Sequence, residues 1–263
     1  MLFHKYWLET RTRFYIGILV ISALCLFFVL GQPWILKQWA LDEIRDPNIY
    51  NPPWIIRAKN DFTFFIWRFL YNNLLQLAWV LLTIMLAIGG ISQELEKGTS
   101  LFTLSLPVTR FKLFSLRILV GFLEAVALAL LPVIIVPLFS ALIGQDYSFL
   151  VAVNHAVLFI TGGLVFYSLG ILINTLIKSE ATAFFISLGM VIVYYFLFQP
   201  YSEGMHEPRL LKYFDLPAII GGNGGKAELT SLNLVPFVSC CVVSFLLLLI
   251  SYYFVKNQDF NDK

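Results

Sequence analysis

The chain alternates between long apolar segments and shorter polar ones, and this pattern predicts its main elements. Six segments hold about twenty or more residues, enough to cross a hydrocarbon layer about 30 Å thick as α-helices. They are residues 14–35, 69–92, 118–143, 147–177, 181–199 and 232–255. Strands of a membrane barrel would instead give segments of about ten residues with alternating polarity. The pattern therefore predicts an all-α membrane protein, with six transmembrane helices in one transmembrane domain over residues 1–263.

The polar segments differ in length and character. Residues 1–13 combine aromatic and basic side chains, as expected for an elbow helix in the headgroup layer. Ordinary basic flanking of a span explains them equally well. On the same side of the membrane as residues 1–13, the pattern predicts a loop at 93–117 and a short turn at 178–180. On the other side it predicts outer loops at 36–68 and 200–231. Basic residues crowd the span ends on the first side, so the positive-inside rule places both termini in the cytoplasm.

The composition agrees with a lipid environment. Hydrophobic residues make up 59% of the chain and charged residues 13%, about half the share typical of soluble proteins. The mean hydropathy is +0.80. These values exclude a soluble enzyme and a disordered chain. A net charge of +2 provides no basic surface for nucleic acid, so the lipid bilayer is an expected partner and nucleic acid is not.

The loop at 93–117 has the most distinctive sequence. It begins with the acidic residues Glu94 and Glu96, and Gly98 follows as a helix stop. An apolar stretch at 101–106 is then closed by Pro107. Apolar side chains are costly to expose to water, so this stretch should contact either the membrane surface or another protein.

Thr109 is placed to cap the helix that follows this loop. The runs ELEKGT at 94–99 and SLPVTR at 105–110 resemble the E-x-E-x-G-T and L-S-x-P-V-S/T-R signature of permease subunits of ABC-2-type ABC transporters. The short inner turn at 178–180 and the aromatic–basic–Asp tail at 254–260 resemble the same family more weakly. Thr109 stands where many members have Ser.

The resemblance implies a transporter in which two permease chains, identical or related, form the membrane pathway. Each chain would bind a separate ABC ATPase subunit through a cytoplasmic coupling helix between spans 2 and 3. The residues implied in this docking are Glu94, Glu96, Gly98, Thr99, Leu101, Leu104, Pro107 and Arg110. A second inner contact is implied for Lys178 and Glu180.

The chain itself carries no motif for ATP hydrolysis. Its glycine cluster at 221–225 precedes Lys226, but a phosphate loop needs Gly at the position of Ile220 and Ser or Thr at that of Ala227. We therefore expect no catalytic residues, no cofactor and no metal in this chain, with ATP and Mg²⁺ held by the partner ATPase. The three cysteines all fall inside apolar runs, without the pair spacing of a zinc or haem site.

Glu124 is the one Asp, Glu, Lys or Arg residue within the six predicted spans. Charged residues inside a membrane are costly and are functional candidates by default. A structural role would pair Glu124 with a neighbouring helix or with Arg117, two turns away on the same helix. The alternative is that Glu124 lines the substrate path or binds a cationic substrate.

The sequence thus predicts the permease subunit of an ATP-driven exporter in the cell membrane. The alternative is a membrane anchor or regulatory subunit that transports nothing and uses the same loop for docking.

Overall fold

The computed structural model describes residues 2–45, 53–89, 109–177, 179–198 and 234–257. All regular elements in these ranges are helices, as predicted, and none of the described residues forms a strand. The elements are α1 (Leu2–Arg45), α2 (Pro53–Asn60), α3 (Phe62–Ile66), the π-helix η1 (Trp67–Leu75), α4 (Gln76–Ala87), α7 (Arg110–Leu142), α8 (Phe149–Leu176), α9 (Glu180–Phe198) and α11 (Leu234–Asn257).

Five helical stretches are long and apolar enough to cross a membrane. They are Leu2–Arg45, Phe62–Ala87, Arg110–Leu142, Phe149–Leu176 and Phe237–Asn257. They coincide with five of the six predicted spans. Helix α9 (Glu180–Phe198) covers the remaining one, and it is not among the five stretches. A multi-pass arrangement is therefore supported, and the count of six stays a prediction.

The N-terminal arm continues directly into the first span. Helix α1 is unbroken from Leu2 to Arg45, so a separate elbow helix over residues 1–13 is not confirmed. The first glycine of the chain is Gly17 and the first proline is Pro33, so nothing in the arm interrupts a helix. The aromatic and basic residues of the arm instead occupy the first turns of α1.

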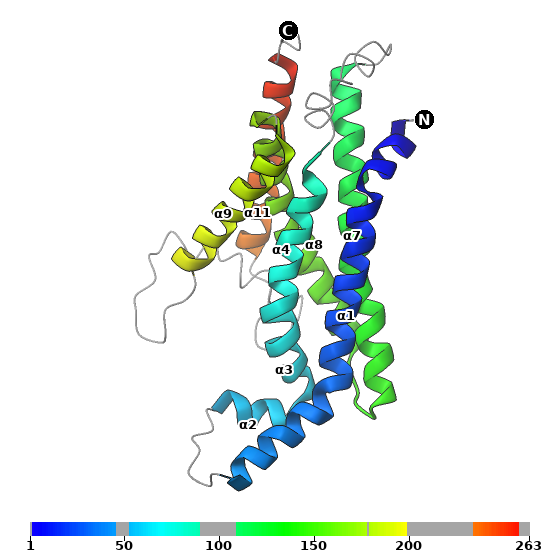
Figure 1. Cartoon of the computed structure of the whole chain (residues 1–263), viewed down its shortest axis with the longest axis vertical. Coiled ribbons are helices and arrows are strands. Elements are labelled where there is room, and N and C mark those ends of the chain that lie inside the picture. The colour runs from blue at the N-terminus through cyan, green and yellow to red at the C-terminus, as the bar shows by residue number, and fades with distance from the viewer. Residues whose placement is uncertain (1, 46–52, 90–108, 178, 199–233, 258–263) are drawn as a thin grey trace.

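The region assigned to an outer loop at 36–68 is largely helical where the structure describes it. Helix α1 extends through it to Arg45, and α2, α3 and the start of η1 follow. Figure 1 shows the last part of α1 inclined to the rest of the helix, with α2 close by. Pro33 lies inside α1 and accounts for such a bend. Glu43 of α1 forms an ion pair with Lys59 of α2, which joins the two segments.

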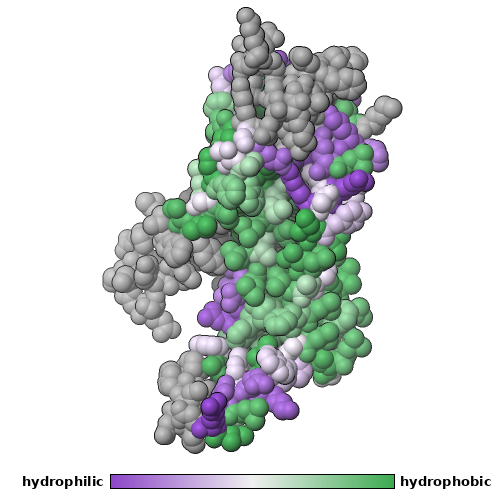
Figure 2. Space-filling model, in the orientation of Figure 1, coloured by the Kyte–Doolittle hydropathy of each residue, from purple (hydrophilic) through white to green (hydrophobic). Residues whose placement is uncertain are grey.

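Helix α8 is the centre of the bundle. It has the largest buried share of the five candidate spans, and α4, α7, α9 and α11 all pack against it. Helix α1 packs mainly on α7. The start of α1 and the end of α11 lie at the same end of the bundle, which we name the terminal end (Figure 1). Hydrophobic residues cover the middle of the face in Figure 2, and hydrophilic residues gather toward its two ends.

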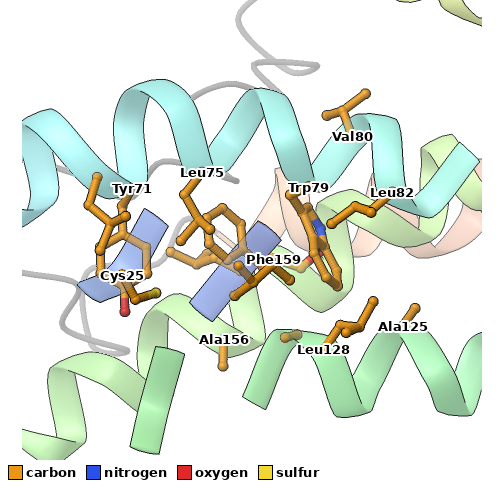
Figure 3. Packing of buried hydrophobic residues seen from close by; sticks show 14 of the residues in the cluster. Cys25, Tyr71, Leu75, Trp79, Val80, Leu82, Ala125, Leu128, Ala156 and Phe159 are labelled. Atoms are coloured by element: carbon orange, nitrogen blue, oxygen red, sulfur yellow. The ribbon is translucent and has the colours of Figure 1, made fainter. Parts of the chain in front are cut away.

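Aromatic residues fill the interior between η1, α4 and α8. Figure 3 shows Tyr71, Leu75 and Trp79, spaced by one helical turn, pointing toward Phe159 of α8. His155 stacks on Tyr71 with ring centroids 4.2 Å apart, and Phe159 packs against both Tyr71 and Trp79. We name Tyr71, Trp79, His155 and Phe159 the aromatic core. All four are fully or almost fully buried.

Glycines let α4 approach α8 closely. A Cβ atom on Gly163 would lie 2.5 Å from Nε1 of Trp79, and one on Gly170 would lie 2.8 Å from Cβ of Ala87. Such small residues are common where membrane helices pack tightly. These two glycines therefore serve packing within one chain.

Candidate functional site

The site is built around the end of α4, directly before the segment that carries the family-like motif. Helix α4 ends at Ala87, and Ile88 has extended backbone angles. The last carbonyl groups of any α-helix have no partner within the helix, and they need other donors when they are buried. Three side chains from three other helices supply those donors here.

Two arginines bind these carbonyl groups. Arg13 of α1 donates from Nη1 to the carbonyl oxygens of Met85, at 3.0 Å, and of Ile88. Arg117 of α7 donates from Nη2 to the carbonyl oxygen of Ile88 at 2.8 Å and is only 8% exposed. A cation at a helix C-terminus also interacts favourably with the helix dipole. The end of α4 is therefore bound to α1 and α7 at one point.

Asn174 of α8 completes the arrangement. Its Nδ2 donates to the carbonyl oxygen of Gly89 at 2.8 Å, and its Oδ1 accepts from the Gly89 amide at 3.2 Å. Gly89 has a φ of +111°, and a Cβ atom there would lie 3.2 Å from a guanidinium nitrogen of Arg13 and of Arg117. Both the backbone conformation and the crowding require glycine. We name Arg13, Arg117 and Asn174 the α4 clamp.

Glu124 lies beside the clamp and is only 3% exposed. The hydroxyl of Thr10 in α1 donates to its Oε1. Among the described residues, Oε2 of Glu124 and Nη1 of Arg117 have no hydrogen-bond partner. Burial disfavours a charged carboxylate at Glu124, and the hydrogen bond from Thr10 and the attraction of Arg117 and Arg13 offset part of that cost.

Glu180 connects α9 to the same cluster. It forms an ion pair with Arg13, and both side chains are partly exposed. Glu180 also lies in the first turn of α9, where a negative charge stabilises the helix. The clamp and its acidic neighbours thus draw residues from α1, α4, α7, α8 and α9.

This arrangement binds backbone and balances charge. Acidic residues lie close to Arg13, with Glu180 in an ion pair, and both arginines donate to carbonyl oxygens at the end of α4. Within the described ranges, no group of three His, Cys, Asp or Glu residues is placed to hold a metal ion. The hydrogen bonds and the ion pair of this cluster hold the ends of these helices together.

The structure brings together only part of the predicted site. Glu124 and Glu180 both lie next to the α4 clamp. Thr109 caps α7 as predicted, because its hydroxyl oxygen accepts from the Lys112 amide at 3.3 Å. Arg110 lies apart, at the start of α7, where its Nη1 donates to the carbonyl oxygen of Lys256 in α11 at 3.0 Å. The loop assigned to 93–117 therefore ends by residue 109, because α7 begins at Arg110.

The other predicted docking positions lie outside the described residues. They are Glu94, Glu96, Gly98, Thr99, Leu101, Leu104, Pro107 and Lys178, and the outer loop at 200–231 lies outside as well.

Two hypotheses were open for Glu124, a structural pairing and a place in the substrate path. Its contact with Thr10 of the neighbouring helix α1 agrees with the structural pairing. From the sequence, Arg117 is predicted only as a partner for Glu124, and no role is predicted for Asn174 or Gly89. Asn174 is a polar residue near the end of an apolar span, and Gly89 starts a Gly-Gly pair at the end of another. Those are the signals that point to a buried contact, but neither indicates what the contact is.

Comparison with known proteins agrees with this architecture. The family described as ABC-2 family transporter protein matches residues 34–240, well over half of the chain. A search of curated proteins gave no match. The matched region runs from the last part of α1 into α11 and includes the end of α4, the start of α7 and all of α8. The chain therefore belongs to the ABC-2 family of transporter proteins and is a membrane permease of an ABC transporter.

Proposed function

We propose that this chain is the permease subunit of an ATP-driven exporter, which works as a dimer and is driven by a separate ATPase subunit bound at 93–109, the part of the predicted 93–117 loop that precedes α7. The observation that carries the proposal is the α4 clamp. It joins Ile88 and Gly89, which lie a few residues before the motif, to α1, α7 and α8. A movement of that segment would therefore reach several spans at once.

The sequence supports a separate ATPase. The segment holds an apolar stretch at 101–106 between charged residues, which suits a protein-binding surface. The chain carries no phosphate loop, so we place ATP and Mg²⁺ in the partner. The terminal end, with both termini and the clamp, is proposed to face the cytoplasm of a cell membrane.

The polarity of the clamp suits a relay between helices. Hydrogen bonds from a guanidinium have defined directions, and packed interfaces shift between discrete arrangements rather than deforming continuously. A tilt of the α4 end would therefore pull on Arg13 and Arg117 together. Arg13 would pass the movement to the start of α9 through Glu180.

The experiment uses the full chain, without its three cysteines, reconstituted in vesicles with its ABC ATPase. A spin label at Leu142→Cys, an exposed position at the far end of α7, reports the distance between the two subunits of a dimer. We expect that distance to change when the ATPase is trapped with vanadate. Arg117→Gln should reduce the change while the ATPase stays bound. Lys112→Gln, an exposed cation on the same helix, is the matched control.

Three results would contradict the proposal. The absence of an intersubunit distance would exclude the dimer, and the absence of ATPase binding would exclude the docking role. A full vanadate-dependent change in Arg117→Gln would exclude the clamp as the relay. Normal ATP hydrolysis and motion without export of any candidate substrate would instead favour an anchor or regulatory subunit.

A further inference from the structure

A cavity of about 390 Å³, which we name the apolar groove, lies between α7, α8 and α11, apart from the α4 clamp. Ligand pockets in proteins span roughly 300–1,000 Å³, so the space is large enough for a bound molecule. Its walls are almost wholly aromatic and aliphatic. They include Phe114, Phe122 and Ile118 from α7, Leu164 from α8, and Leu248 and Tyr252 from α11. An occupant must therefore present a hydrocarbon surface to these walls.

Two cations continue the walls of the cavity toward the terminal end. Arg110 precedes Phe114 by four residues, and Lys256 follows Tyr252 by four, so each extends its wall by one helical turn. The hydrogen bond from Arg110 to the Lys256 carbonyl oxygen shows that these two turns meet. Both residues are exposed. Lys112, two residues after Arg110, adds a third exposed cation.

An apolar cavity that ends at paired cations has the polarity of an anionic phospholipid. The acyl chain matches the aromatic and aliphatic walls, and the phosphate matches Arg110 and Lys256. Basic pockets between membrane helices commonly bind anionic headgroups in this way. A water-soluble phosphate compound would leave the apolar part empty, and a zwitterionic lipid would use the cations less well.

We propose that this groove, formed by α7, α8 and α11 with Arg110 and Lys256 at its mouth, is a binding site for one anionic phospholipid. Its assignment to the cytoplasmic leaflet rests on the proposed orientation of the chain. Binding itself depends only on the groove and is measured without the ATPase, so a failure here leaves the proposed function untouched.

The test is a titration of the detergent-purified full chain, followed by native mass spectrometry. The probes are phosphatidylglycerol, phosphatidylcholine with the same acyl chains, and glycerol phosphate. We expect one saturable phosphatidylglycerol per chain, weaker phosphatidylcholine binding and no glycerol phosphate adduct. Arg110→Gln or Lys256→Gln should each weaken phosphatidylglycerol binding about fivefold, since an interfacial cation contributes about 1 kcal/mol to the attraction of an anionic lipid.

Two further variants test the acyl-chain part of the site. Ser115 lines the cavity, so Ser115→Trp should fill it and remove binding of both lipids. Ala127→Trp places the same ring at an exposed position elsewhere on α7 and should leave binding unchanged. Arg11→Gln, which removes an exposed cation on α1 at the terminal end, is the matched charge control.

The proposal is overturned if the two lipids bind the unmodified chain equally, or if Arg11→Gln weakens binding as much as Arg110→Gln. It is also overturned if Ser115→Trp leaves phosphatidylglycerol bound but converts dimers to monomers, because the groove would then be a subunit contact. Glycerol phosphate binding comparable to that of the lipid would indicate a site for soluble phosphates and contradict the acyl-chain assignment.

Discussion

The α4 clamp and the aromatic core both bind α4 to neighbouring helices, α8 among them, yet they do so by opposite means. In the clamp, charged and amide side chains bind backbone oxygens at the helix end. In the core, rings pack on rings, and the main polar link is the bond from Trp79 Nε1 to the Phe159 carbonyl oxygen at 2.8 Å. One contact is directional and electrostatic, and the other is broad and apolar.

The difference shows where movement is expected. Dispersion contacts between tightly packed rings are many and weak, and they favour one arrangement of the helices. Guanidinium–carbonyl bonds are few and strong, and they can be exchanged for other carbonyls of the same helix end. The core therefore holds α4 on α8, while the clamp is suited to follow changes in the segment after Gly89. Four substitutions test this division.

The largest effect is expected at Arg117. Arg117→Met leaves the Ile88 carbonyl oxygen with fewer donors and takes one nearby cation from the buried Glu124. We expect unfolding free energy to fall by about 3 kcal/mol, as for other buried charges that lose a partner. Reversible unfolding by SDS in mixed micelles measures this change.

A second variant separates charge from packing at the same position. Adding Glu124→Leu to Arg117→Met should recover part of the loss, because the buried charge is then removed as well. Lys112→Met, at an exposed position, should change the stability by less than about 0.5 kcal/mol. Equal losses in all three variants would show that the clamp has no special electrostatic role.

The next effect is expected in the apolar contact between α4 and α8. Gly163→Ala would place a methyl group 2.5 Å from the Trp79 ring nitrogen, and we expect a loss of about 2 kcal/mol from overpacking. Gly31→Ala in α1 is the control, because no atom other than those of its chain neighbours and the nearby backbone of α1 lies within 4 Å of its Cβ position. That variant should be neutral or slightly stabilising. A similar response at both sites in the same unfolding assay would contradict the tight packing.

A somewhat smaller effect is expected at Gly89. Gly89→Ala combines an unfavourable backbone angle with contact to both arginines, and we expect a loss of about 1.5 kcal/mol. Gly144 also has a positive φ, of +71°, but open space around it. Gly144→Ala should therefore cost less, about 1 kcal/mol, and the difference reports the crowding in the clamp together with the less favourable φ of Gly89. Equal losses would mean that the two guanidinium groups move aside freely.

The smallest effect is expected when Trp79 is replaced by 3-benzothienylalanine. This analogue keeps the two fused rings in the core and has sulfur in place of the ring N–H, so it removes only the hydrogen bond to Phe159. Hydrogen bonds between membrane helices contribute about 0.6 kcal/mol on average, and we expect a loss of that size in the SDS unfolding assay. A loss as large as that of Arg117→Met would show that the core depends on polar contacts as much as the clamp does.

Part of this site was predictable from single residues. Glu124 was recognisable because a carboxylate in an apolar span needs a partner, and Thr109 because a hydroxyl before a helix caps it. The contacts of Arg13 were not predictable. Its target is the backbone of α4, more than seventy residues away, and a backbone carbonyl leaves no mark in a sequence. The helix over residues 36–45 was missed because a polar composition hides a continuing helix.

By itself, the sequence determined the all-helical membrane architecture and a resemblance to the family that the comparison then showed. It could do so because span length, apolarity and a short loop motif are local properties. The tertiary structure decided that Glu124 and Glu180 belong to one cluster, that Gly163 and Gly170 face α4, and that Arg110 meets Lys256 beside an apolar groove. These are contacts between distant helices, and they depend on how each helix is rotated about its axis. That rotation follows from the packing of all helices together, which no single segment encodes.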